Sequence, residues 1–146
     1  MSKEIWRTIR ARQIYGGIQK ELVMKFVIDG RLDGLNDYTR ACRKNRYAGA
    51  DMKKKNQQMV NLYVLRAKLK KITNYPCKLQ INFYEGDLKR DVDNVGFGTK
   101  FILDSLVEMG VLENDSRKYV TGVHYDVFLD RNNPRVEVEI YECGAS

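Results

Sequence analysis

Two segments of the chain alternate strictly between apolar and polar residues, and they constrain the fold more than any other feature of the sequence. Residues 78–84 place Leu79, Ile81 and Phe83 on one side, and residues 135–141 repeat the pattern. This period of two is typical of a strand that buries one face. The sequence therefore predicts a sheet with one face against a hydrophobic core.

Helices complete the predicted core, because two segments carry apolar residues at helical spacing. The predicted elements are, in chain order, a strand at 25–28, a helix at 51–72, a strand at 78–84, a helix at 98–109, and strands at 119–129 and 135–141. Strong turn residues at 130–134 predict that the last two strands form a hairpin. Residues 35–50 show no clear period. We expect a single α+β domain with a mixed β-sheet and two main helices.

A chain of 146 residues is long enough for one domain. It has no run of about 18 apolar residues, which predicts no membrane span. Its N-terminus lacks the apolar stretch of a secretory signal, and its three cysteines do not form a CxxC pair. These features predict a protein of the reducing cytoplasm.

The first 23 residues fit this scheme poorly, and the compact domain is expected to span 24–146. Lys20 and Glu21 can be encoded as AAGGAG, which resembles a bacterial ribosome-binding site placed ahead of a start codon at Met24. We therefore expect residues 1–23 to be an upstream extension that is absent from the native product.

The positive charge of the chain is concentrated in one segment. Residues 40–71 hold 11 of the 26 Lys and Arg residues but only one of the 19 acids, Asp51, and the whole chain carries a net charge of +7. Such a patch favours a polyanion, usually nucleic acid, although a solvated helix face is the alternative. The candidate phosphate contacts on the predicted helix are Lys53, Lys54, Lys55 and Arg66. Pairing of Tyr47 with Arg46 and of Tyr63 with Arg66 is interpreted as packing rather than base stacking.

Two carboxylates stand two residues apart at Asp91 and Asp93, and an extended backbone would point both to the same side. Ionised acids at this spacing repel unless a cation joins them. Oxygen ligands without thiolate or imidazole favour Mg²⁺ or Mn²⁺. The alternative is an Asp-rich turn or helix N-cap. Asp115 follows the next helix and is expected to converge with the pair, while Lys100 would supply positive charge for phosphoryl chemistry.

The same region resembles the RusA family of Holliday junction resolvases. The resemblance covers the chain from about Met24 onward and rests on LNDY at 35–38, KLQINFYEGD at 78–87, RDVDN at 90–94, KFILDSLVEMG at 100–110 and VLEND at 111–115. It implies a homodimeric, Mg²⁺-dependent endonuclease that cuts four-way DNA junctions. The essential acids would be Asp91, Asp93 and Asp115, and the active-site lysine would be Lys100.

The resemblance also suggests further DNA contacts. Arg90 and Asn94 match positions that flank the acids, Lys89 precedes them, and Asn36 lies in a predicted loop with either a DNA contact or a turn role. The segment 95–99 is about three residues longer than the family leads us to expect, and its two glycines are expected to let it bulge. Asp104, four residues after Lys100, either orients that lysine or is a surface acid.

Two other functions remain open from the sequence. The same acids would serve a nuclease that acts on flap or fork DNA. A non-catalytic basic DNA-binding module, with the acids as loop caps, would need no metal.

Overall fold

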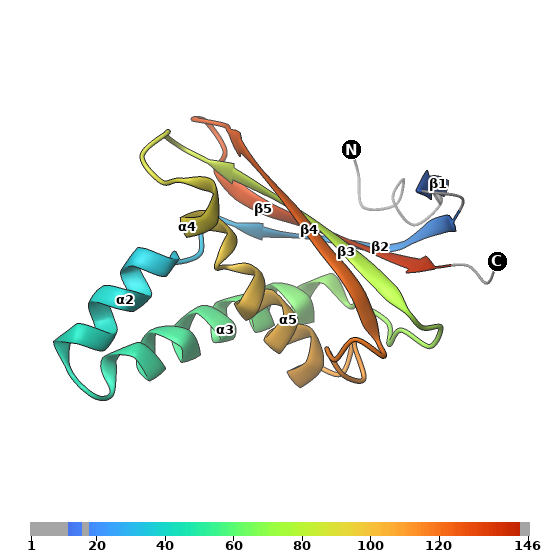
Figure 1. Cartoon of the computed structure of the whole chain (residues 1–146), viewed down its shortest axis with the longest axis horizontal. Helices are drawn as coiled ribbons and strands as arrows, with labels where there is room; N and C mark the ends of the chain where they lie inside the picture. The colour runs from blue at the N-terminus through green and yellow to red at the C-terminus, as the bar shows by residue number, and fades with distance from the viewer. Residues whose placement is uncertain (1–11, 16–17, 144–146) are drawn as a thin grey trace.

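The computed structural model describes residues 12–15 and 18–143, which form one sheet with helices on one of its faces (Figure 1). The elements are β1 (Arg12–Tyr15), β2 (Ile18–Asp29), α2 (Leu35–Lys44), α3 (Ala48–Ala67), β3 (Cys77–Glu85), α4 (Val92–Gly96), α5 (Thr99–Glu108), β4 (Val120–Leu129) and β5 (Arg135–Cys143). The predicted α+β class is confirmed.

The five strands lie in the order β1-β2-β5-β3-β4. β3 and β4 run parallel, and the other neighbouring pairs are antiparallel, so the sheet is mixed as predicted. The two alternating segments lie side by side, with Leu79 opposite Ile140 and Ile81 opposite Val138. Their apolar residues therefore share the buried face of the sheet.

The predicted hairpin between the last two strands is wrong. β5 lies between β2 and β3, whereas β4 lies at the edge beyond β3. The connection from β4 to β5 instead passes the end of β3, where the Asp130 N–H donates to the Glu85 carbonyl oxygen at 2.8 Å. Turn residues predict that the chain reverses, but they do not determine which strand it then pairs with.

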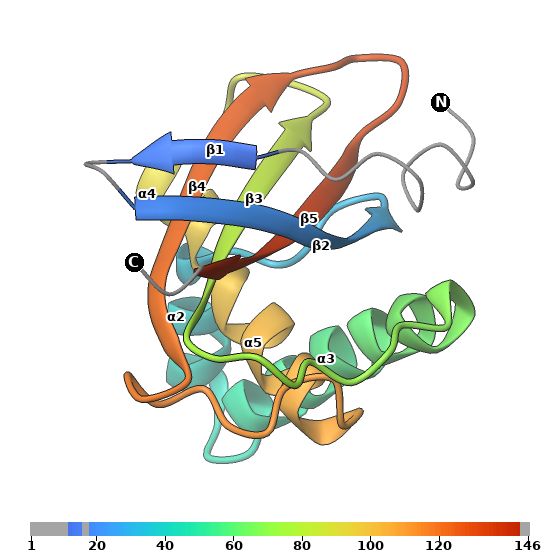
Figure 2. The same cartoon turned by 90° about the vertical axis from the view of Figure 1, so that its right-hand side faces the viewer.

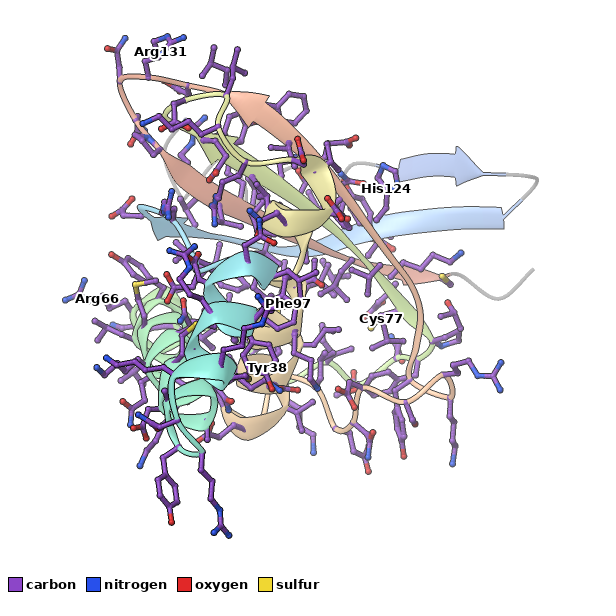
Figure 3. All side chains as sticks on the ribbon, turned by 60° about the vertical axis from the view of Figure 1, so that its left-hand side comes forward. Tyr38, Arg66, Cys77, Phe97, His124 and Arg131 are labelled. Atoms are coloured by element: carbon purple, nitrogen blue, oxygen red, sulfur yellow. The ribbon has the colours of Figure 1, made fainter. Side chains whose placement is uncertain are left out.

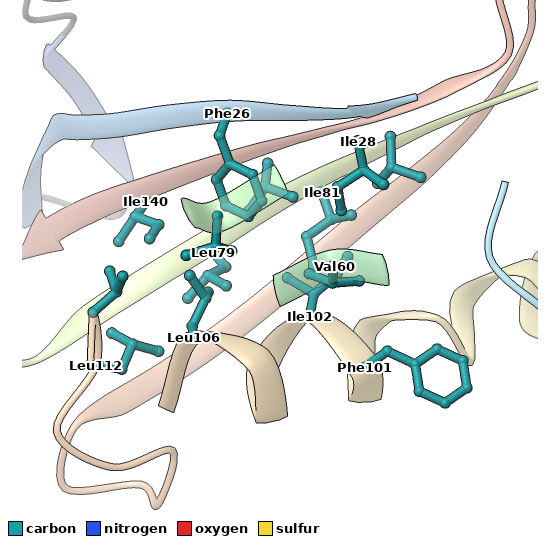
Figure 4. Packing of buried hydrophobic residues seen from close by; sticks show 14 of the residues in the cluster. Phe26, Ile28, Val60, Leu79, Ile81, Phe101, Ile102, Leu106, Leu112 and Ile140 are labelled. Atoms are coloured by element: carbon teal, nitrogen blue, oxygen red, sulfur yellow. The ribbon is translucent and has the colours of Figure 1, made fainter. Parts of the chain in front are cut away.

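Two helices, α3 and α5, cover the buried face of the sheet (Figures 2 and 4). Val60 of α3 and Ile102 and Leu106 of α5 are fully buried and belong to the same core cluster as Leu79 and Ile81. The predicted helices are therefore confirmed, although α3 runs over Ala48–Ala67 instead of 51–72. Helix α3 is capped by Lys68, whose φ of 51° is left-handed.

The sheet continues upstream of Met24, because β2 begins at Ile18. Leu22 is buried and pairs with Tyr141 of β5. Residues 1–11 lie outside the described part of the chain. The absence of residues 1–23 from the native product stays a prediction.

Candidate active site

The acid pair lies at the start of the short helix α4. Asp91 is the N-cap, with extended φ and ψ of −71° and 161°, and Asp93 lies in the first helical turn. Both residues are exposed, and Asp91 makes no side-chain capping hydrogen bond. The chain is helical from Val92, so the extended backbone that would align the two acids is absent, and the alternative of a helix N-cap is confirmed for Asp91. Positions two apart on a helix do not face each other, so the spacing alone does not bring these two carboxylates together.

Arg90, which precedes the acid pair, is buried in the protein instead of being presented to DNA. Its Nε and Nη2 each lie 2.7 Å from Glu85 Oε1, and its Nη1 donates to the Leu32 carbonyl oxygen at 3.0 Å. The side chains of Arg90 and Glu85 are only 9% and 8% exposed. The predicted DNA contact at Arg90 is therefore corrected, because the guanidinium joins the end of β3 to the loop before α2.

Asn94 has a similar bracing role inside α4. Its side chain is buried, and its Oδ1 accepts a hydrogen bond from the Asn36 backbone N–H at 2.9 Å. A Cβ at Gly34 would lie 2.4 Å from that oxygen, so only glycine allows this approach. The predicted DNA contact at Asn94 is corrected as well. Asn36 lies in helix α2 and not in a loop, and its exposed side chain leaves its DNA contact a prediction.

The two glycines of the segment 95–99 serve close packing and do not form a bulge. Gly96 ends α4, where an added Cβ would lie 2.1 Å from the ring of Tyr125 on β4. At Gly98 an added Cβ would approach Leu32 and Phe83 at 3.2 Å, and its φ of −60° is open to any residue. Residues 95–99 therefore continue from α4 into α5 and pack closely against the sheet.

Lys100 lies in the first turn of α5 and is exposed. Its Nζ lies 3.3 Å from Asp104 Oδ1, one helical turn further along. The structure therefore favours the orienting role for Asp104 over that of an unrelated surface acid. The catalytic role of Lys100 stays a prediction.

Asp115 does not join the acid pair within one chain. It is exposed in the loop after α5, at the end of that helix away from α4 (Figures 1 and 2). A ten-residue helix is about 15 Å long, so α5 separates the two sites. Among residues 12–15 and 18–143, no three His, Cys, Asp or Glu side chains are close enough to hold a metal ion. The three-acid metal site therefore stays a prediction.

The basic residues lie on the helical hairpin formed by α2 and α3. Lys54, Lys55 and Arg66 are exposed, whereas Lys53 places its Nζ 4.6 Å from the centre of the Tyr38 ring. That ring stacks on Phe97, just after α4, with centroids 5.3 Å apart (Figure 3). These contacts attach the basic hairpin to the helix that carries the acids.

The remaining residues singled out from the sequence differ in how far their side chains are exposed. Lys89 is exposed in the loop between β3 and α4. Tyr63 packs against the core with Arg66 5.8 Å from its ring, so the packing interpretation is confirmed there. Arg46 lies 5.6 Å from the Tyr47 ring, so the two side chains also pack on each other, but that ring is 66% exposed.

The comparison with known families gives one match. The family model for Endodeoxyribonuclease RusA matches residues 31–141. The chain belongs to the RusA family of endodeoxyribonucleases. The match includes both helices of the basic hairpin, the acid pair and Asp115, while no curated protein matches the chain. Within the described part of this RusA-family chain, no helix is long and apolar enough to span a membrane.

One residue of this RusA-family site was not predicted from the sequence. Glu85, the buried partner of Arg90, has the same strand parity as Leu79, Ile81 and Phe83. That parity alone places an acid on the buried face, where it needs a cationic partner. The alternation could therefore have identified the Glu85–Arg90 pair.

Proposed function

We propose that the chain resolves four-way DNA junctions by metal-dependent cleavage of paired phosphodiester bonds. Family membership supports nuclease chemistry, and one observation carries the choice of site. Asp91 and Asp93 are exposed at the start of a helix whose two flanking motif residues, Arg90 and Asn94, are buried braces. Such bracing holds the two acids outward, where a phosphate can approach.

The charges favour DNA approach from the helical side of the sheet. The opposite face mixes acids with cations, since Glu137 of β5 is paired with Lys25 at 3.1 Å and with Arg135 at 3.4 Å. The helical side carries the exposed cations of α2 and α3. Since the unpaired positive charge gathers on the helical side, we infer that the basic hairpin tracks the phosphate backbone without reading bases.

Asp91, Asp93 and Asp115 would supply oxygen ligands suited to Mg²⁺ or Mn²⁺. The ion would lower the pKa of a bound water and offset charge on the phosphate. Lys100 would add positive charge beside the reacting phosphate, with its ammonium oriented by Asp104.

The separation of Asp115 from the acid pair supports a homodimer as the active form. We propose that Asp115 of the partner subunit completes the site begun by Asp91 and Asp93. A symmetric pair of chains would then hold two sites, one for each of two opposing strands.

The test is a cleavage assay that compares a synthetic four-way junction with flap, fork and linear duplex DNA, with and without Mg²⁺. We expect Mg²⁺-dependent cutting of the junction. The Asp93→Asn variant should bind the junction at least as tightly but leave it uncut. Preferred cutting of flap or fork DNA would favour that nuclease instead, and Mg²⁺-independent binding without cutting would favour a non-catalytic module.

A mixture of two inactive variants tests the shared site. If Asp93 and Asp115 act across subunits, a heterodimer of Asp93→Asn and Asp115→Asn chains retains one intact site and nicks one strand. If they act within one chain, every site in the mixture carries one substitution, and no nicking is regained.

A further inference from the structure

The turn between α2 and α3 presents an aromatic ring to solvent. Tyr47 is 66% exposed, compared with 46% for Phe128 on the edge strand β4. It is the N-cap of α3, and the Arg46 guanidinium carbon lies 5.6 Å from its ring centre. Neither the acid pair nor the core uses this ring.

The turn is held rigidly by its own contacts. Asn45 Oδ1 accepts hydrogen bonds from the backbone N–H groups of Tyr47 and Ala48 at 3.0 and 2.9 Å. Behind the turn, an added Cβ at Gly49 would lie 2.6 Å from Cys42 Sγ, so α2 and α3 are in close contact. The backbone that carries Tyr47 is therefore fixed by local hydrogen bonds and helix packing.

The surroundings of the ring are strongly cationic. Arg43, Lys44 and Arg46 are all exposed, and residues 40–50 contain no acid. An exposed aromatic ring among such cations can stack on a nucleobase while the cations contact the neighbouring phosphates. Bases within a duplex are already stacked on one another, so this ring can stack only on an unpaired base.

The turn is also tied to the candidate active site. Helix α2 begins at the Asn36–Asn94 hydrogen bond beside α4 and extends for ten residues, about 15 Å, to the turn. One bound DNA branch can therefore reach both the turn and the acid pair.

We propose that Tyr47 stacks on an unpaired base of branched DNA, with Arg43, Lys44 and Arg46 holding the flanking phosphates. This inference rests on the proposed function and adds a reason for preferring a branch point at which a base is unpaired to intact duplex, because the paired arms of a four-way junction offer the ring no free base. The cations alone bind any duplex, whereas the ring contributes only where a base is unpaired.

The test measures fluorescence anisotropy in EDTA with three probes: a four-way junction, a duplex with a single-stranded oligothymidine gap, and the intact duplex. Tyr47→Ala should weaken binding to the gapped duplex by roughly 5- to 150-fold, the range for one lost stacked base, and leave intact-duplex binding unchanged. Tyr47→Phe should bind like the unsubstituted chain, because the ring face remains. Leu65→Ala, which removes a 63% exposed side chain near the other end of α3, is the matched control and should change nothing.

The inference is overturned if Tyr47→Ala binds the gapped duplex normally, or if it weakens gapped and intact duplex equally. Parallel cleavage assays separate this result from the proposed function. If the wild-type chain cuts the junction and Tyr47→Ala binds the gapped duplex normally, the nuclease proposal stands and the stacking role fails. If binding depends on Tyr47 but no DNA is cut, the stacking role stands and the nuclease proposal fails. If the wild-type chain binds none of the probes, both proposals fail.

Discussion

Replacing Arg90 with alanine should destabilise the fold without removing a DNA contact. The guanidinium makes two 2.7 Å contacts to Glu85, and both side chains are less than a tenth exposed. Loss of one partner from a buried ion pair lowers the free energy of unfolding by about 3–5 kcal/mol. With a urea dependence of about 2 kcal/mol per molar, the unfolding midpoint should fall by roughly 1.5–2.5 M.

The assay combines urea unfolding with the salt dependence of duplex binding, measured where each variant is folded. Arg90→Ala should keep the wild-type salt slope, because a buried guanidinium releases no counterions from DNA. The neighbouring Lys89 is exposed and is the matched control. Lys89→Ala should keep the unfolding midpoint and reduce the slope by about 0.9, the value for one phosphate contact.

A double variant separates loss of the pair from loss of volume. Glu85→Leu with Arg90→Met replaces the buried charges with apolar side chains and should recover most of the lost stability. An Arg90→Ala variant with a normal unfolding midpoint and a reduced salt slope would refute the bracing role.

Three further experiments test the packing and titration of the fold. Gly96→Ala should lower the free energy of unfolding by about 1–3 kcal/mol or more in urea, because the new methyl group meets the Tyr125 ring. Burial raises the pKa of Cys77 to about 11, so at pH 8 this thiol should react with Ellman's reagent only after unfolding. The hydrogen bond from Arg135 lowers the pKa of Asp130 in the fold, so its stabilisation is present above the unfolded pKa and is lost as pH falls through the folded one. The stability difference between wild type and Asp130→Asn should therefore disappear well below about pH 4, as urea unfolding across that range would measure.

The elements that could be predicted from the sequence are those that bury a regular face. Strands β3 and β5 alternate because every second residue enters the core, and α5 carries its apolar residues at helical spacing. Helix α2 was missed because none of its residues is buried, which leaves no apolar stripe. Its one local signal is Asp37, whose Oδ2 accepts a hydrogen bond from the Gly34 N–H at the helix start.

The candidate site was harder to predict, because its arrangement depends on contacts between distant segments. The motif singles out Asp91 and Asp93, which are exposed, but it gives no sign that Arg90 and Asn94 have partners inside the protein. The sequence predicts that Asp115 lies near Asp91 and Asp93. In the structure helix α5 lies between them, and Asp115 follows the end of α5 that is away from the acid pair. Strand order and helix direction, which decide such distances, leave little trace in local residue patterns.

The position of β5 has a consequence for when this fold can form. It follows every other described element along the chain, yet it lies inside the sheet between β2 and β3. Asp29 must find Arg135, and Leu22 must find Tyr141, before β2 is joined to the rest of the sheet. Such long-range pairing slows folding. During synthesis β2 and β3 cannot be joined in one sheet until the ribosome has made β5.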